Sequence, residues 1–356
     1  ENPKVGLVYG TKDDFMQGHA TYISCGTVNG SPSRVFEQTL SGLKDETEYL
    51  YVAKAELDGE IVYADTLSFT TLKKEKDETS LKEGLALFYE STGGSNWKQN
   101  GGWLDNEVPL DYWYGVNMYN SDLSLKLNDN NLVGDAILKN VDNIAEIDLS
   151  DNTLQSFKIE GGSIAPWGGR FTIENNKARG GMNILMNHVK ILPTWGLNFH
   201  TTGCTISDAS FSDCTFEEHG DAIEFNSDKV NTIHVEKCTN FPGISGYGRI
   251  GEDFNKYEIY SKLNINEISL KDNVLSDFFS INLVKCSSLT ISNSQSRYIN
   301  FGSDCEIDNV VIEDALLHSV DVGGVNKIWG SDLYTVGAKI NNIVLDTKGS
   351  ERLSFS

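Results

Sequence analysis

The chain has 356 residues, 39% hydrophobic and 22% charged, which is enough for two or three folded domains. Acidic residues number 51 against 29 lysines and arginines, and the formal charge of -22 argues against nucleic acid and anionic membrane surfaces as partners. No apolar run is long enough to cross a bilayer. Because the chain begins at Glu1, we expect a mature or trimmed form, compatible with a removed signal peptide or lipid anchor.

Residues 1–72 predict a small β-domain. Asp58-Gly59 separates two strand-like runs, which is a strong hairpin signal because this turn needs positive φ at both positions. The preceding run Leu43-x-x-x-Thr47-x-Tyr49 resembles the signature of fibronectin type III domains, in which the tyrosine hydroxyl pins the corner before a central strand. About two initial strands of such a sandwich are missing, so the resemblance implies a partial immunoglobulin-like domain that acts as a spacer.

Residues 73–79 are a charge-dense linker, and the segment 80–120 predicts a cap that begins with a helix. Ser80-x-x-Glu83 reads as a capping box at the start of this helix. Apolar residues follow at helical spacing, and the glycine pair that starts at Gly93 ends the helix.

Three tryptophans follow the predicted helix, namely Trp97, Trp103 and Trp113. Together with the helix they resemble the N-terminal cap of leucine-rich-repeat proteins, in which the tryptophans cover the first coil of the solenoid. Burial in the cap is therefore favoured over sugar stacking, since aromatic side chains bury large areas.

Residues 121–356 carry an internal repeat, which is the signature of a solenoid. The consensus L-x-L-x-x-N-x-L matches at residues 125–132 and 147–154, further copies begin at residues 171, 233 and 268, and looser copies begin at residues 289 and 310. Each coil contributes a short strand with two inward apolar residues, so neighbouring coils must stack to bury them. The pattern resembles the short repeats of bacterial surface leucine-rich-repeat proteins, with a second short strand on the opposite side of each coil.

The repeat also predicts two columns at the turn that follows each strand. Asn130, Asn152, Asn176 and Asn273 are expected to form an internal ladder that bonds backbone groups left unpaired by the bend. The residue before each ladder position is expected to point outward, and this column comprises Asp129, Asp151, Asn175, Lys237, Asp272, Asn293 and Asp314.

The aspartates of the outward column, Asp129, Asp151, Asp272 and Asp314, raise the hypothesis of a Ca²⁺ site. A hydrated acidic surface is the favoured alternative, because hard cations need six or more converging oxygens. We expect no cofactor and no metal.

The fold class is therefore mainly β, a short sandwich followed by a capped leucine-rich-repeat solenoid. The family resemblance implies a non-catalytic adhesion or binding protein, secreted or at the cell surface, where an outer-membrane lipoprotein is expected. Its partner is expected to be an extracellular protein or polysaccharide. A parallel β-helix polysaccharide lyase or hydrolase and a purely structural stalk remain as alternatives.

Candidate ligand-binding residues fall into two groups. Trp167, Trp195 and Tyr247 are aromatic residues in glycine- or proline-rich loops, for which burial in the core is the alternative. The other group consists of residues expected to point outward from the strands, namely Asp148, Glu174, Glu236, Lys271 and Glu313.

Overall fold

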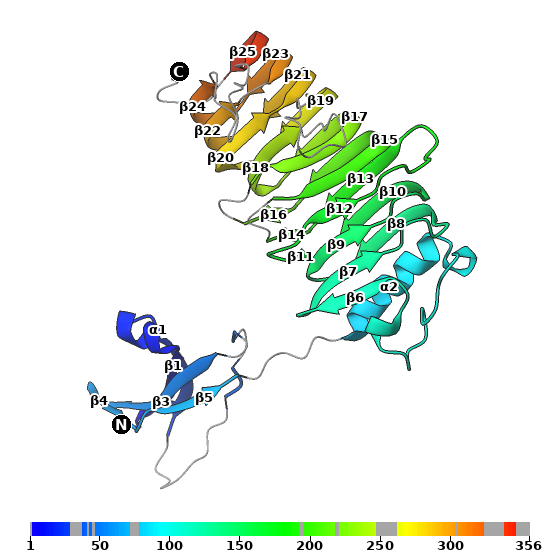
Figure 1. Ribbon diagram of the computed structural model, residues 1–356. Coiled ribbons are helices and arrows are strands. Elements are labelled where there is room, and N and C mark those ends of the chain that lie inside the picture. The colour runs from blue at the N-terminus through cyan, green and yellow to red at the C-terminus, as the bar shows by residue number, and fades with distance from the viewer. Residues whose placement is uncertain are drawn as a thin grey trace, which may run out of the picture. The chain divides into compact units, whose positions relative to one another are not determined.

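The computed structural model divides into two compact units, Glu1–Asp77 and Glu78–Ser356 (Figure 1). Within the part of the chain that the structure describes, no helix is both long and apolar enough to span a membrane. The described residues are 2–28, 38–40, 43–44, 47–71, 78–192, 196–217, 221–246, 262–302, 305–323 and 338–346.

The first unit contains a five-stranded antiparallel sheet and one short helix. Strand β3 pairs with β1 along one edge and with both β4 and β5 along the other, while β2 pairs with the far side of β1. Helix α1 (Lys12–Gln17) begins at a capping box between Thr11 and Asp14. The strands are β1 (Lys4–Gly10), β2 (Thr21–Thr27), β3 (Glu48–Leu57), β4 (Glu60–Tyr63) and β5 (Leu67–Thr70).

Two local predictions for this unit are confirmed. Asp58 and Gly59 form the turn between β3 and β4 with φ values of 50° and 86°, the positive pair that this hairpin needs. The Tyr49 hydroxyl accepts a hydrogen bond of 3.0 Å from the backbone N–H of Lys44, which pins the chain before β3. The described residues contain one sheet of the expected sandwich, so the sandwich itself stays a prediction.

The second unit begins with helix α2 (Glu78–Ser91), which the structure places earlier than predicted. Ser80 lies inside the helix, so its assignment as the capping residue is wrong. Glu78 extends the first turn, where a negative charge interacts favourably with the helix dipole. Gly93, with a φ of 69°, follows the helix and leads into the 3₁₀ turn η1 (Gly94–Asn96), as the glycine pair predicted.

The three tryptophans of the cap are buried, which confirms their structural role. Each indole N–H donates to a backbone carbonyl, that of Trp97 to Thr92 and that of Trp103 to Tyr114. Trp113 is only 2% exposed, and its ring centroid lies 5.2 Å from that of Trp103. These rings close the end of the solenoid core, so they are not available to stack on a ligand.

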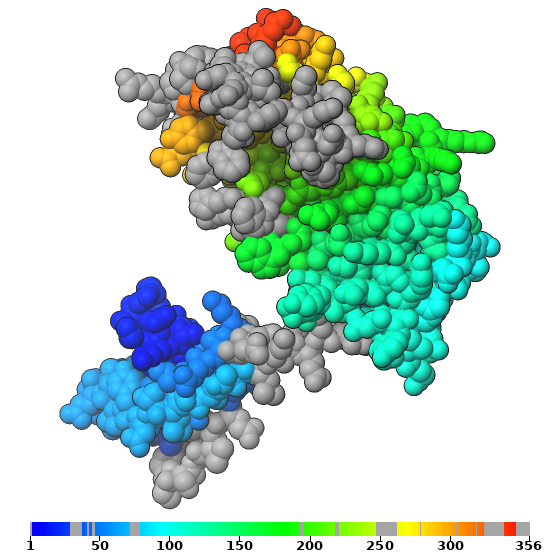
Figure 2. Space-filling view, in the orientation of Figure 1, coloured from blue at the N-terminus to red at the C-terminus, as the bar shows by residue number. Residues whose placement is uncertain are grey.

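The solenoid consists of three stacks of parallel strands, which successive coils visit in turn (Figure 1). The coils follow one another in chain order, from cyan through green to orange, in the space-filling view (Figure 2). The first stack contains β7 (Asp122–Lys126), β9 (Ile144–Asp148), β12 (Arg170–Thr172), the first parts of β15 (Asn198–Ser212) and β17 (Ile223–Glu236), and the last parts of β18 (Thr239–Gly246), β20 (Val274–Asn282), β22 (Gln295–Phe301) and β24 (Leu316–Val322).

The other two stacks continue each coil. The second contains β8 (Val133–Lys139), β10 (Thr153–Glu160), β13 (Met182–Asn187), the last parts of β15 and β17, β19 (Leu263–Lys271), β21 (Val284–Ser292), β23 (Glu306–Glu313) and β25 (Lys339–Asp346). The third contains β11 (Ser163–Ile164), β14 (Lys190–Ile191), β16 (Thr215–Phe216) and the first parts of β18, β20, β22 and β24.

Inward side chains of the three stacks form one continuous core. Phe157 of the second stack packs against Phe171 at 5.3 Å, and Phe171, Phe199 and Phe225 of the first stack lie one above another, with successive ring centroids 5.2 Å apart. This spacing is close to the ~4.8 Å between paired strands, so each coil buries its ring against the next. The predicted parallel solenoid is therefore confirmed as an architecture.

The repeat that the sequence presents as one column occupies two different corners of the coil. Asn152 lies between β9 and β10, where the first stack turns into the second. Asn273 lies between β19 and β20, where the second stack turns into the third, so its assignment to the ladder of Asn130, Asn152 and Asn176 is wrong. Both corners follow a strand with alternating apolar residues, which is why their sequences look alike.

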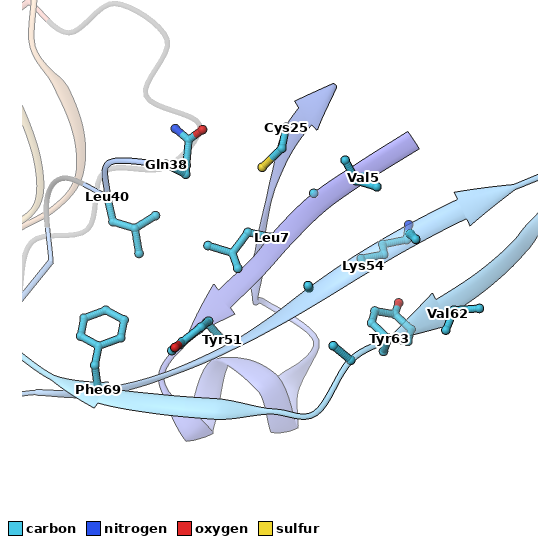
Figure 3. Close-up of a pocket in the computed structure, with 14 residues that line it drawn as sticks. Val5, Leu7, Cys25, Gln38, Leu40, Tyr51, Lys54, Val62, Tyr63 and Phe69 are labelled. Atoms are coloured by element: carbon cyan, nitrogen blue, oxygen red, sulfur yellow. The ribbon is translucent and has the colours of Figure 1, made fainter. Parts of the chain in front are cut away.

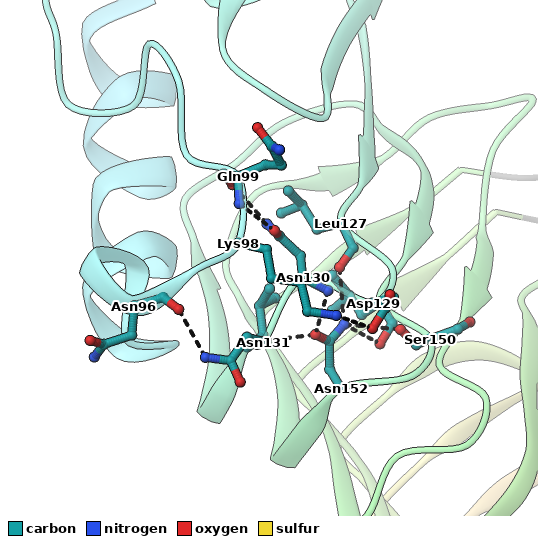
Figure 4. Close-up of polar contacts among 11 residues, drawn as sticks. Asn96, Lys98, Gln99, Leu127, Asp129, Asn130, Asn131, Ser150 and Asn152 are labelled. Carbon is teal, nitrogen blue, oxygen red and sulfur yellow. Dashed lines mark hydrogen bonds and ion pairs between the residues drawn. The ribbon is translucent and has the colours of Figure 1, made fainter.

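Each corner has its own ladder of inward polar side chains. In the first, the Asn152 carboxamide donates to the carbonyls of Leu127 and Leu149 at 3.0 and 2.9 Å and accepts from the N–H of Leu132 at 2.9 Å. Asn130 extends this ladder into the cap, because its side chain exchanges two hydrogen bonds of 2.8 Å with the backbone of Gln99 (Figure 4).

In the second corner, the Asn273 side chain accepts from the N–H of Cys238 and donates to the carbonyl of Val235, at 2.8 and 2.9 Å. Here Cys214, Cys238 and Ser294 stand in for asparagine, as Cys204 does in the first corner. These bonds satisfy backbone groups that the bends leave unpaired.

Candidate functional site

The outward residues at both corners have a conformational explanation. All seven adopt positive φ, between 46° and 57°, a region in which aspartate and asparagine are strongly favoured among residues other than glycine. Asp129, Asp151 and Asn175 occupy the first corner, whereas Lys237, Asp272, Asn293 and Asp314 occupy the second. The predicted single column of acceptors is therefore wrong.

The Ca²⁺ hypothesis loses its geometric basis with this division. Asp129 and Asp151 lie at one corner and Asp272 and Asp314 at the other, so the four carboxylates do not converge. Lys98 forms an ion pair with Asp129, and the side chain of Asn293 donates to Asp272 at 2.6 Å. Among the described residues, no group of three or more acidic, histidine or cysteine side chains is placed to hold a metal ion.

The candidate ligand-binding residues also separate. Asp148 and Glu174 belong to the first stack, where Asp148 pairs with Thr172, two residues before Glu174. The other three, Glu236, Lys271 and Glu313, share one register row on the second stack. Trp195 and Tyr247 lie outside the described residues.

Trp167 is the one predicted aromatic that the described residues include, and its side chain is 78% exposed. The alternative of core burial is therefore wrong for it. It lies in the turn between β11 and β12, with Pro166 before it and Gly168 after it. A Cβ atom at Gly168 would stand 2.5 Å from the Cα atom of Ala145, so the turn presses against β9 and only glycine fits.

The surface next to Trp167 is formed by ten polar side chains, which we call the polar face. Neighbouring strands of the first stack present them in two register rows, and all are half-buried or exposed. The first row is Ser124, Glu146, Arg170, Asn198 and Glu224, and the second is Lys126, Asp148, Thr172, His200 and Asn226.

Titratable groups on and beside the polar face are partly removed from water. Burial raises the pKa of the Glu174 carboxyl, with further contributions from the charges of Asp148 and Asp151. Burial likewise raises the pKa of Glu224, helped by Asp221. These carboxylates are thus incompletely hydrated and can accept hydrogen bonds from ligand hydroxyl groups.

The polar face supplies donors as well as acceptors. Burial lowers the pKa of His200, and the charge of Arg170 lowers it further. This imidazole therefore stays neutral at physiological pH. Its Nδ1 atom lies 3.4 Å from the side-chain nitrogen of Asn226. Arg170 and the carboxamides of Asn198 and Asn226 add donors, so a partner rich in hydroxyl or amide groups can bond in both directions.

Sequence reasoning found Trp167, Asp148 and Glu174 but missed Arg170, His200 and Glu224. The signal for these three was present in the short runs Arg170-Phe-Thr172, Asn198-Phe-His200 and Ile223-Glu-Phe225. In each run a buried phenylalanine has polar neighbours, the alternation of a strand with one face in water. The first run overlaps the repeat copy that begins at residue 171, whereas the other two lack the consensus and are not marked by the repeat.

A second candidate site is an apolar cavity of about 820 Å³ on one face of the sheet in the first unit (Figure 3). Leu7, Tyr51 and Phe69 line it together with Val62, which is 67% exposed. Apart from Gln38, Lys54 and the thiol of Cys25, the lining is mainly apolar, and nothing among the described residues shows what covers it.

Comparison with known proteins adds no further constraint. No family model, no curated protein and no solved structure matches this chain.

Proposed function

We propose that this chain is a non-catalytic binding protein of the cell surface, which holds an extended protein or glycan on the polar face beside Trp167. The sequence resembles bacterial surface leucine-rich-repeat proteins, and this resemblance provides the analogy for the proposed role. A rigid stack of coils offers a long surface that needs little ordering when a partner binds.

The observation that carries the proposal is the exposure of Trp167. An indole ring that is 78% exposed contributes little to folding, whereas covering it with a ligand buries a large apolar area. The turn that carries the ring packs against β9, and Arg170, three residues further along the chain, begins β12. The ring therefore combines a fixed position with polar neighbours that can orient a ligand.

The experiment is a binding assay of the purified chain on an array of extracellular proteins and polysaccharides. We expect at least one reproducible hit that Trp167→Ala removes. The matched control is Tyr298→Ala, which removes another exposed aromatic side chain, on β22 outside the polar face, and should leave that hit unchanged. Absence of any hit would favour the structural stalk and contradict the proposal.

A parallel β-solenoid enzyme that cleaves polysaccharides is the second candidate. The raised pKa values of Glu174 and Glu224 favour it, because glycoside hydrolysis uses a carboxylic acid kept protonated by its surroundings. Shortening of an arrayed polysaccharide by the chain, abolished in Glu174→Gln or Glu224→Gln, would establish this activity in place of simple binding.

A further inference from the structure

A second exposed aromatic side chain lies on the same surface as Trp167. Tyr119 ends strand β6 (Val116–Tyr119), which pairs antiparallel with β7 and so extends the first stack at the cap. Val116 is 6% exposed and Met118 packs against the core, whereas Tyr119 is 73% exposed. Because side chains alternate along a strand, Tyr119 points outward, on the side that carries the polar face.

The register places Tyr119 and Trp167 along one margin of the first stack. Tyr119 pairs with Asp122, the first residue of β7, and Trp167 precedes Arg170, the first residue of β12. Strands β6, β7, β9 and β12 are neighbours in that order, so three strand spacings of ~4.8 Å, or about 14 Å, separate the two ends. An extended ligand that crosses the strands can contact both rings.

The surface between the two rings is polar. The outward side chains in register on the intervening strands and on β12 are Ser124, Lys126, Glu146, Asp148, Arg170 and Thr172. A protein hot spot would present packed apolar and aromatic groups surrounded by a rim. Separate aromatic rings with donors and acceptors between them instead match a sugar chain, whose C–H faces stack on rings while its hydroxyl groups give and accept hydrogen bonds.

Charge narrows the class of sugar. Asp122, Glu146 and Asp148 outnumber Lys126 and Arg170 on this part of the surface, and the whole chain carries a formal charge of -22. An anionic polysaccharide would be repelled, whereas an uncharged one would not.

We propose that Tyr119 and Trp167 are two aromatic platforms of one binding site for an uncharged polysaccharide, which runs across strands β6 to β12. This rests on the proposed binding function of the polar face and adds to it a ligand class, a direction and a second anchoring residue.

The test is affinity electrophoresis of the full chain in gels that contain mannan, xylan or mixed-linkage β-glucan, with heparin and polygalacturonate as charged probes. We expect retardation by at least one uncharged polysaccharide and by neither charged one. Trp167→Ala and Tyr119→Ala should each weaken binding by about tenfold, since each removes one stacking surface. Thermal melts should show that both variants fold like the parent chain, because both side chains are exposed.

The matched control is Tyr298→Ala. Tyr298 is also an exposed tyrosine on the first stack, but β15, β17, β18 and β20 separate its strand from β12, and the guanidinium of Arg297 lies 5.6 Å from its ring centre. This variant should bind like the parent.

Four results would overturn the inference. Binding that only Trp167→Ala weakens would remove Tyr119 from the site, and retardation by the charged probes alone would contradict the ligand class. A protein hit on the array that depends on Trp167, with no retardation by any polysaccharide, would overturn the inference while leaving the proposed binding function intact. No binding in either assay would contradict both the proposed binding function and this inference.

Discussion

At the scale of single residues, backbone conformation explains the acidic corners better than ligand binding does. Asp151 and Asp213 have φ values of 57° and 51°, in the left-handed region that costs most residues about 1–2 kcal/mol. Aspartate and asparagine tolerate this region, and Gly203 replaces them in one coil of the first corner. The sequence pattern shows where these residues recur, but not that their φ is positive. For this reason it predicts an outward column of acceptors in place of a conformational requirement.

Substitution of the exposed residue Asp213 tests this explanation. Asp213→Gly should change the free energy of unfolding by less than about 0.5 kcal/mol, whereas Asp213→Val should lower it by about 1–2 kcal/mol, because a β-branched side chain is disfavoured at positive φ. Urea denaturation measures both values. Equal stability of the two variants would show that conformation does not select the residue, and an increase in melting temperature with millimolar Ca²⁺ would revive the metal hypothesis.

The six cysteines should differ in reactivity. All are free thiols, but only Cys25 is half-exposed, while the other five are buried in the solenoid. Burial raises the pKa of Cys286 to about 11 and that of Cys305 to about 12, which leaves little thiolate at neutral pH. A thiol reagent should therefore modify one cysteine quickly and the other five only on unfolding.

Cys25→Ser provides the control for this measurement, since it should abolish the fast phase and leave the slow one. Fast modification of two or more thiols in the native protein would contradict the burial of the five cysteines in the solenoid.

The raised pKa of Glu174 has a consequence for stability. Burial and the charges of Asp148 and Asp151 favour the protonated carboxyl in the folded state, so this group stabilises the fold below the unfolded pKa of about 4.3 and loses that contribution as the pH rises through the folded pKa. Glu174→Gln should thus raise the free energy of unfolding at pH 7, by less than about 1 kcal/mol because the side chain is half-exposed.

The gain from Glu174→Gln should disappear toward about pH 3, more than one unit below the unfolded pKa of about 4.3, where the carboxyl is neutral in the folded and unfolded chain. Urea denaturation at the two pH values measures the difference. A stabilisation that is the same at both would show that the effect is not electrostatic.

At the scale of structural elements, the corner ladders fix how one coil joins the next. The Asn152 carboxamide bonds backbone groups of its own coil and of the preceding one, at 2.9 to 3.2 Å. Replacing it with alanine leaves several buried backbone groups without partners, at about 1–3 kcal/mol each.

Asn152→Ala should therefore lower the free energy of unfolding by at least about 2 kcal/mol, as measured by urea denaturation. Thr153→Ala, at the exposed neighbouring position, is the matched control and should change it by less than about 0.5 kcal/mol. A similar small effect of both substitutions would mean that the ladder does not hold the coils together.

The sequence predicted the elements of the solenoid well, but not their placement around the coil. Consensus copies such as 125–132 and 147–154 marked the strands and the first corner, because inward leucine and isoleucine alternate with polar residues there. The copies that begin at Ile233 and Ile268 were aligned with them although they belong to the second stack. A strand followed by a left-handed corner has the same pattern in either stack, so pairing alone distinguishes them.

The candidate site was only partly predictable for a related reason. Trp167 stood out as an aromatic among glycine and proline, but whether such a ring is buried depends on the turn that carries it. Nothing in the sequence marks Tyr119 as a site residue, because only the pairing of β6 with β7 shows that it faces the same side as Trp167.

At the scale of the whole molecule, a separate β-unit precedes a solenoid that contains the continuous core and the polar face. The net charge of -22 argues against a binding mode based on neutralising an anionic partner. Binding through aromatic rings and hydrogen bonds should instead depend little on salt, because no ion pairs with the ligand are screened.

The most direct test of the central claim is the affinity of the full chain for its polysaccharide or protein hit, compared between the parent and Trp167→Ala. The account predicts that the parent binds, that the binding persists when salt is raised, and that the variant loses it while unfolding at the same temperature. Binding that is unchanged in the variant would contradict the account, because it would place the functional surface away from the polar face.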